Sequence, residues 1–127
     1  MLDTNICIYI MNRTPVQVAQ RMDQCHLGEV VMSSITYAEL IVGTLMATDC
    51  AHAKTQLDRF VAAVPVVAFD QAAATAYGPI RVATKERKKD LMDKLIAAHA
   101  AALGVVVVTN NTDDFKAYPG ITIENWV

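Results

Sequence analysis

The chain has 127 residues, which is the length of one domain and enough to bury a hydrophobic core. Although 54% of its residues are hydrophobic, no apolar run approaches the roughly eighteen residues needed to span a bilayer, and no export signal is indicated. We therefore expect a soluble cytoplasmic protein. The formal net charge of −2 excludes a molecule whose overall field attracts nucleic acid, so such binding requires a local basic patch.

The three cysteines, Cys7, Cys25 and Cys50, are an odd number at scattered spacing. This pattern fits neither a disulfide framework nor a zinc site. We expect free thiols.

The first candidate site residue is Asp3, which stands with Thr4 and Asn5 directly ahead of an apolar run at 6–11. The run predicts a short helix, and an aspartate before a helix is most simply explained as its cap. A short strand that ends here would also place these polar groups at the carboxyl edge of a sheet, where α/β folds bind ligands. Asp3 can serve in both ways.

Thr14 and Pro15 predict the start of a second helix, which Gly28 should end. Residues 30–33 are apolar without alternation, which predicts a strand that is covered on both faces.

The second candidate is Glu39, which follows that strand. Thr36 and Glu39 have the spacing of a capping box that opens a helix running to about Leu45. A glutamate in the first turn after a strand also lies near the carboxyl end of that strand, so capping and a site role are compatible.

The middle of the chain predicts two more helices around a third strand. Asp49 is placed to cap the first helix, and Asp70 to cap the second. Residues 64–69 form the strand, and Pro79 should bend or divide the helix that follows. Residues 81–94 are then strongly basic, which usually indicates a solvated helix face or loop.

The third candidate, Asp93, lies in the most apolar predicted helix, 91–103, which Gly104 should end. A buried carboxylate there needs a stabilising partner: the helix N-terminus, Lys89 or a bound cation. We interpret His99 in the same helix as a packed core residue.

Residues 105–108 give the strongest signal for a buried strand, followed by a polar turn at 109–115 and a short last strand at 121–123. Strands separated by helices predict a single α/β domain over 1–127 with a mostly parallel sheet. The carboxyl edge of that sheet then collects the candidate residues, listed in chain order as Asp3, Glu39, Asp93 and Asn111. Asp93 reaches this edge only if two helices separate the third and fourth strands.

Carboxylates gathered at one edge would repel one another unless a cation or a proton intervened. Oxygen ligands of this kind suit Mg²⁺ or Mn²⁺. Such an ion activates water and stabilises charge on a phosphate, so the sequence predicts phosphodiester hydrolysis.

Four segments together resemble the PIN-domain ribonucleases, and most closely the VapC toxins of bacterial toxin–antitoxin pairs. The segments are Met1-Leu2-Asp3-Thr4-Asn5, Ser33-Ser34-Ile35-Thr36-Tyr37-Ala38-Glu39-Leu40, Asp93-Lys94-Leu95-Ile96-Ala97-Ala98-His99-Ala100 and Val107-Val108-Thr109-Asn110-Asn111. They occur in the family's order and span almost the whole chain.

The resemblance implies an α/β/α sandwich with a Mg²⁺ or Mn²⁺ site that cleaves structured RNA such as tRNA loops. By motif position, Asp3 and Asp93 would be metal ligands, and Glu39 would bind metal or orient the attacking water. Asn111 stands where the family often has a further acid, which leaves a second metal open, and Asp113 or Asp114 could substitute for it.

The resemblance also implies a homodimer and a VapB-type antitoxin that reaches the acidic pocket with a basic side chain. The chain departs from the family where Arg87-Lys88-Lys89 replaces a Gly/Pro-containing segment before the third acid. This basic segment would lie beside the site, and contact with RNA phosphates is one role for it.

Two other readings are open. A phosphoacceptor receiver domain has similar length, but Asp3 lacks an acidic neighbour and no lysine follows the last strand. A relative that binds RNA or a partner without cutting is disfavoured by the presence of all three acids.

Overall fold

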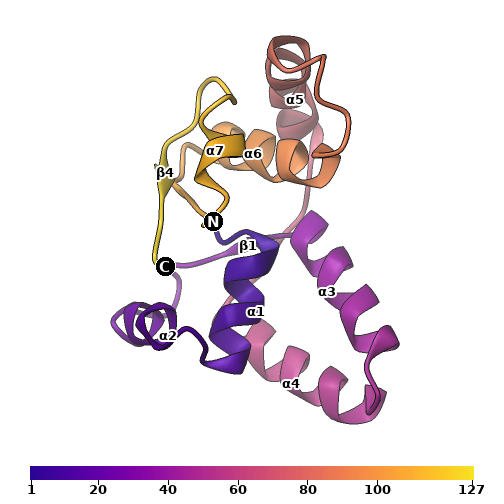
Figure 1. Ribbon diagram of the computed structural model, residues 1–127, viewed down its shortest axis with the longest axis vertical. Coiled ribbons are helices and arrows are strands. Elements are labelled where there is room, and N and C mark those ends of the chain that lie inside the picture. Colours follow the sequence, from indigo (N-terminus) through magenta and orange to yellow (C-terminus); the bar gives the residue numbers. More distant parts are fainter.

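The computed structural model describes residues 1–127 and contains seven helices and four short strands (Figure 1). The helices are α1 (Thr4–Asn12), α2 (Val16–Asp23), α3 (Ser34–Met46), α4 (Cys50–Ala63), α5 (Gln71–Ala83), α6 (Leu91–Leu103) and α7 (Thr112–Phe115). The strands are β1 (Met32–Ser33), β2 (Val66–Val67), β3 (Val107–Val108) and β4 (Ile123–Glu124). No helix is both long enough and apolar enough to cross a membrane.

The strands form the parallel arrangement that the sequence predicts. β1 pairs with β2, and β3 pairs with β4, both in parallel. Leu2 joins the two pairs, because it forms parallel bridges with Met32 on one side and Val108 on the other. The order across the sheet is therefore β2, β1, Leu2, β3, β4, and the carboxyl ends of all five segments meet at one edge.

Two apolar clusters cover the two faces of this sheet. Leu2 and Val108 point into a cluster with α1 and α4, whereas their neighbours Met1 and Val107 point into a cluster with α5, α6 and α7. This alternation is the two-residue period of a strand. In Figure 1, α1, α2 and α4 lie on one side of β1, and α5, α6 and α7 lie on the other. The α/β/α sandwich is confirmed.

Three local signals behave as predicted. Asp49 accepts a hydrogen bond from the amide of His52, and Asp70 accepts one from the amide of Ala73, so both cap their helices. Gly104 ends α6 with φ of 68°, in the left-handed region where glycine is favoured.

The capping box at Thr36 and Glu39 is wrong. Ser33 is the cap of α3, since its Oγ accepts a hydrogen bond from the amide of Ile35 at 3.1 Å. The hydroxyl of Thr36 is buried without a hydrogen-bond partner. Glu39 thus lies in the second turn of α3 and takes no part in capping.

Other boundaries also differ from prediction. Helix α5 runs through Pro79 without division, and α2 ends at Asp23, well before Gly28. The predicted polar turn at 109–115 contains the short helix α7, because the amides of Phe115 and Lys116 donate to the carbonyl oxygens of Asn111 and Thr112. β1, β2 and β3 each keep only two of their predicted residues, and β4 keeps only Ile123 and adds Glu124, since only these residues pair with a neighbour.

The predicted helix pair between the strands at 64–69 and 105–108, now β2 and β3, is present. Helices α5 and α6 pack on each other, and α6 begins after the loop at 84–90. This connection returns the chain to the carboxyl edge of the sheet, which places Asp93 in the first turn of α6 beside the other acids.

Candidate active site

Asp3 has the two roles that its sequence position allows. Its Oδ1 accepts a hydrogen bond from the amide of Ile6 at 2.9 Å and so caps α1. The side chain is 3% exposed, and burial raises its pKa, an effect opposed by hydrogen bonds from Thr109 and Ile6 and increased by the charge of Glu39. A buried acid next to a second acid is costly in the ionised form.

Glu39 projects from α3 toward the end of the Leu2 segment. Its Oε1 accepts a hydrogen bond from Thr4 Oγ1 at 2.5 Å, which ties α3 to the first turn of α1. The sequence placed Thr4 in the polar group that opens the chain but gave no sign that this hydroxyl would hold Glu39.

Asp93 is the most perturbed acid of the group. Its pKa is raised to about 6, first by burial and then by the charge of Asp3, with smaller contributions from Glu39 and Asp114. The amide of Asn111 opposes the shift by donating to Asp93 Oδ2 at 3.1 Å. Among the stabilisers considered for Asp93, Lys89 forms no ion pair with it.

Asn111 joins the acids of α6 and α7. Its Nδ2 donates to Asp93 and also to Asp114 Oδ2, at 2.9 Å. The sequence left Asp113 and Asp114 as equivalent substitutes for a fourth acid. The structure separates them, since the side chain of Asp113 is 98% exposed and that of Asp114 faces Asn111.

The four acids Asp3, Glu39, Asp93 and Asp114 come from four elements and form one electrostatically coupled group. As arranged here, no three His, Cys, Asp or Glu side chains are grouped closely enough to hold a metal ion. Two of the carboxylates instead accept hydrogen bonds from neutral side chains: Glu39 from Thr4, and Asp93 from Asn111. The set fits a hard cation chemically, because every donor is oxygen, but closing around an ion requires side-chain rotation.

The prediction that His99 is a core residue is confirmed. It is 1% exposed, its Nδ1 lies 2.8 Å from Ser33 Oγ, and its ring meets that of Phe69 edge-on. Because Ser33 begins α3 and His99 lies on α6, this contact braces the two helices that carry Glu39 and Asp93.

The interpretation of the whole 81–94 stretch as a solvated face is wrong for Lys94, which is 1% exposed. Its Nζ pairs with Asp90 at 3.1 Å and donates to the carbonyl oxygen of Thr84 at 3.1 Å and to that of Arg87. The sequence carried a signal for this, because Lys94 shares a helix face with Ala97 and Ala98, which are buried.

Residues 1–121 match the PIN domain family. The tRNA(fMet)-specific endonuclease VapC of Shigella flexneri is 37% identical over 99% of this chain and 96% of that protein. Among solved structures, DNA-bound VapBC from Salmonella typhimurium covers 100% of this chain and 97% of the matched chain, with 36% identity and a TM-score of 0.90. VapBC2 from Rickettsia felis, bound to a fragment of promoter DNA, covers 100% and 98% at 31% identity, with a TM-score of 0.88.

Proposed function

The chain belongs to the PIN-domain family and, within it, to the VapC ribonucleases, and on this basis we propose that it is a divalent-metal-dependent endoribonuclease acting as the toxin of a toxin–antitoxin pair. One observation supports the chemistry above all. Burial raises the pKa of Asp93, and the charges of Asp3, Glu39 and Asp114, which come from three other elements, raise it further. Acids that repel one another at a single edge of a sheet are suited to share a cation.

In this proposal, Asp3 and Asp93 hold Mg²⁺ or Mn²⁺, and Glu39 either completes the ion's ligands or orients water. Bound there, the ion would lower the pKa of water and stabilise the charge that develops on the phosphate. Asn111 holds Asp93 and Asp114 in register through its single amide nitrogen. Asp114 is the fourth acid of the site, because Asn111 occupies the position where the family often has one.

We propose tRNA as the substrate class. The relatives from Shigella flexneri and Salmonella typhimurium are named tRNA(fMet)-specific endonucleases, at 37% and 36% identity over 99% of this chain. Initiator tRNA is therefore the first RNA to test, with an elongator tRNA as its control.

The test is cleavage of these RNAs by the purified chain with Mg²⁺, Mn²⁺ or EDTA. Asp3→Asn and Asp93→Asn should abolish cutting while the fold, followed by circular dichroism, stays intact. Neighbouring acids on α7 give a matched pair: Asp114→Asn should reduce the rate by about tenfold or more, and Asp113→Asn should leave it unchanged. Cutting that persists in EDTA, or in both Asp3→Asn and Asp93→Asn, would refute the metal site.

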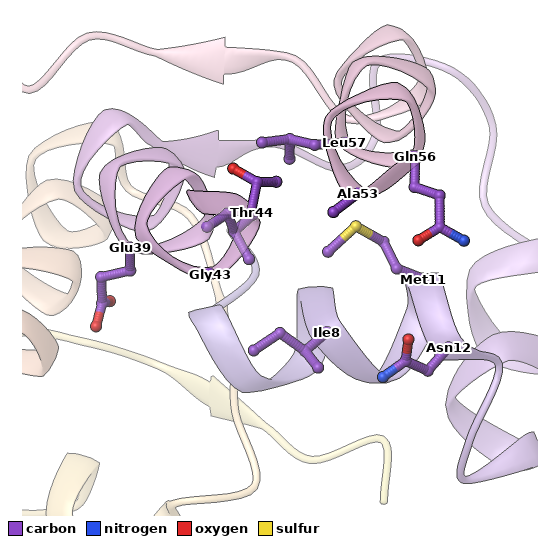
Figure 2. A pocket seen from close by; sticks show the side chains of 10 residues that line it. Ile8, Met11, Asn12, Glu39, Gly43, Thr44, Ala53, Gln56 and Leu57 are labelled. Atoms are coloured by element: carbon purple, nitrogen blue, oxygen red, sulfur yellow. The ribbon is translucent and has the colours of Figure 1, made fainter. Parts of the chain in front are cut away.

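The proposed partner is a VapB-type antitoxin. A pocket of about 250 Å³ lies between α1, α3 and α4. Figure 2 shows Glu39 at one side of it and the apolar side chains of Ile8, Met11 and Leu57 around it. Leu45 and Met46, at the end of α3, are 72% and 81% exposed. An apolar antitoxin segment would fill this pocket, and a basic side chain beside it could reach Glu39.

Two measurements test the assembly. Ala53→Arg, which blocks the pocket, should prevent inhibition by the antitoxin without slowing RNA cleavage. Ala62→Arg, on an exposed part of α4 outside the pocket, should leave both the inhibition and the cleavage rate unchanged.

The chain alone should elute as a homodimer in gel filtration with light scattering. A monomer at micromolar concentration would refute the dimer.

A further inference from the structure

The loop between α5 and α6, residues 84–90, carries the densest positive charge in the chain. Lys85, Lys88 and Lys89 are exposed, and none of them forms an ion pair. Arg87 differs, because it pairs with Asp90 at 3.0 Å and with Asp114 at 2.8 Å. The charges left free to meet a ligand are therefore those of the lysines.

Lys94 holds this loop in place. The buried ammonium group of Lys94 donates to the carbonyl oxygens of Thr84 and Arg87 and pairs with the carboxylate of Asp90, so it contacts both ends and the middle of the loop. A buried ion that lost these partners would be expensive. The loop is consequently fixed in position although its lysines are exposed to solvent.

Arg87 fixes the loop against the acids. Its guanidinium contacts Asp114, and Asp114 accepts from Asn111, which also donates to Asp93. Three contacts thus lead from the basic loop to the acid with the raised pKa.

A polar depression of about 400 Å³ lies at this junction. Its lining has no apolar residue and consists of Glu86, Arg87, Lys88, Lys89, Asp90 and Asp114. Arg87 and the buried Lys94 together offset the charges of Asp90 and Asp114, so the lining charges outside any ion pair are those of two lysines and one glutamate. Asp114 is part of both the depression and the acidic group, so the two are adjacent.

We propose that this depression binds phosphate groups of the substrate RNA next to the phosphate that is cleaved. Lys88 and Lys89 contact the phosphates, and Lys94 is a positioning residue that holds the loop. The proposal rests on the ribonuclease function proposed above and adds where the RNA backbone lies. A molecule with net charge −2 has no general attraction for RNA, so a local contact of this kind is required.

The test is the affinity of the full chain for a labelled single-stranded RNA in EDTA, measured by fluorescence anisotropy at several salt concentrations. The double variant Lys88→Gln/Lys89→Gln should bind about tenfold more weakly at low salt, and its dependence of log K on log salt should be shallower by about 1.4, the value for two phosphate contacts on a single strand. The matched control, Lys54→Gln/Arg59→Gln, removes two exposed positive charges from α4, on the other side of the sheet, and should bind as the parent does.

Cleavage kinetics with metal give a second readout. Loss of phosphate contacts away from the reacting atoms should raise KM by a similar factor and leave kcat nearly unchanged, since such binding is equal in the ground and transition states. A fall in kcat with unchanged KM would contradict the proposal.

The role of Lys94 is tested with Lys94→Met, which leaves the charges of the depression unchanged and leaves Asp90 with Arg87 and Tyr118 as partners. Hydrogen exchange of the Arg87 amide, which donates to the carbonyl oxygen of Thr84, should become faster, and RNA affinity should fall although RNA cannot reach residue 94. Faster exchange with unchanged affinity would overturn the positioning role.

The outcomes separate the two proposals. If the parent binds and cuts RNA while Lys88→Gln/Lys89→Gln keeps the parent's affinity and salt dependence, the phosphate site is refuted and the ribonuclease stands. If the parent neither binds nor cuts RNA, both are refuted.

Discussion

Replacing Asp93 with asparagine should stabilise the metal-free protein at neutral pH while abolishing its activity. Burial and the charges of Asp3, Glu39 and Asp114 make the ionised form of Asp93 unfavourable and raise its pKa to about 6. Asparagine removes the charge but keeps an oxygen that can accept the hydrogen bond from Asn111. The variant therefore lacks the repulsion between Asp93 and the neighbouring acids, which destabilises the parent but accompanies the charges needed to bind the proposed metal ion.

The magnitude follows from the pKa. A rise from 3.8 to about 6 corresponds to about 3 kcal/mol of unfavourable free energy in the fully ionised state. Asp93 is only partly buried, so solvent screening reduces this to about 1.5 kcal/mol. Loss of a negative charge from the first turn of α6 offsets about 0.5 kcal/mol. A net gain of about 1 kcal/mol remains, which is roughly a 4 °C rise in Tm.

The gain should depend on pH in a defined way. Between about pH 4 and pH 6, folded Asp93 keeps a proton that the unfolded chain has released, so the parent loses stability as pH rises through this window. Asp93→Asn lacks this loss. Urea unfolding in EDTA at about pH 4.5 and pH 7.5 should show the variant's advantage only at the higher pH.

Metal provides the control. Mg²⁺ or Mn²⁺ at ten times its Kd should stabilise the parent by roughly 1.4 kcal/mol at about pH 7.5 and leave Asp93→Asn almost unaffected. If the variant is as stable as the parent, or less stable, at both pH values, the acids do not repel one another and the reasoning fails.

Three further variants test the fold and the site. Leu2→Ala should lower the free energy of unfolding by about 3 kcal/mol in urea, because Leu2 is fully buried and bridges both halves of the sheet; a loss below about 1 kcal/mol would contradict this role. Burial lowers the pKa of His99, and the charge of Asp70 opposes this shift. As pH falls below about 6.5, the unfolded chain therefore binds a proton at His99 that the folded chain does not, and the folded protein loses stability. His99→Gln should reduce this loss of stability in acid, and an unchanged pH profile would refute the explanation. Asn111→Ala should weaken Mn²⁺ binding, measured by calorimetry, by about tenfold, since ligand-orienting contacts of this kind have such effects; Asn110→Ala, which removes a contact to Tyr9 instead, should not.

Local signals in the sequence identified features whose cause is also local. Asp49 and Asp70 cap helices because a short acceptor satisfies free amides two or three residues ahead, and Gly104 ends a helix because it adopts positive φ without strain. The order of strands and helices likewise predicted which edge of the sheet collects Asp3 and Glu39.

Features that depend on distant partners could not be predicted in this way. Asp113 and Asp114 are identical neighbours in sequence, and only the turn of α7 directs one toward Asn111 and the other into solvent. Ser33 and Thr36 are both plausible caps. The choice of Ser33 depends on where β1 stops pairing, which is set by β2, more than thirty residues away.

The hydroxyl of Ser33 contacts both the amide of Ile35 in the first turn of α3 and the imidazole of His99. The separation of the helices bearing Glu39 and Asp93 is thereby set from inside the molecule, before any cation enters. With these helices held in place, only side-chain rotation brings the acids onto an ion, so we expect Ca²⁺, which prefers longer bonds and more ligands than Mg²⁺, to be a poor substitute.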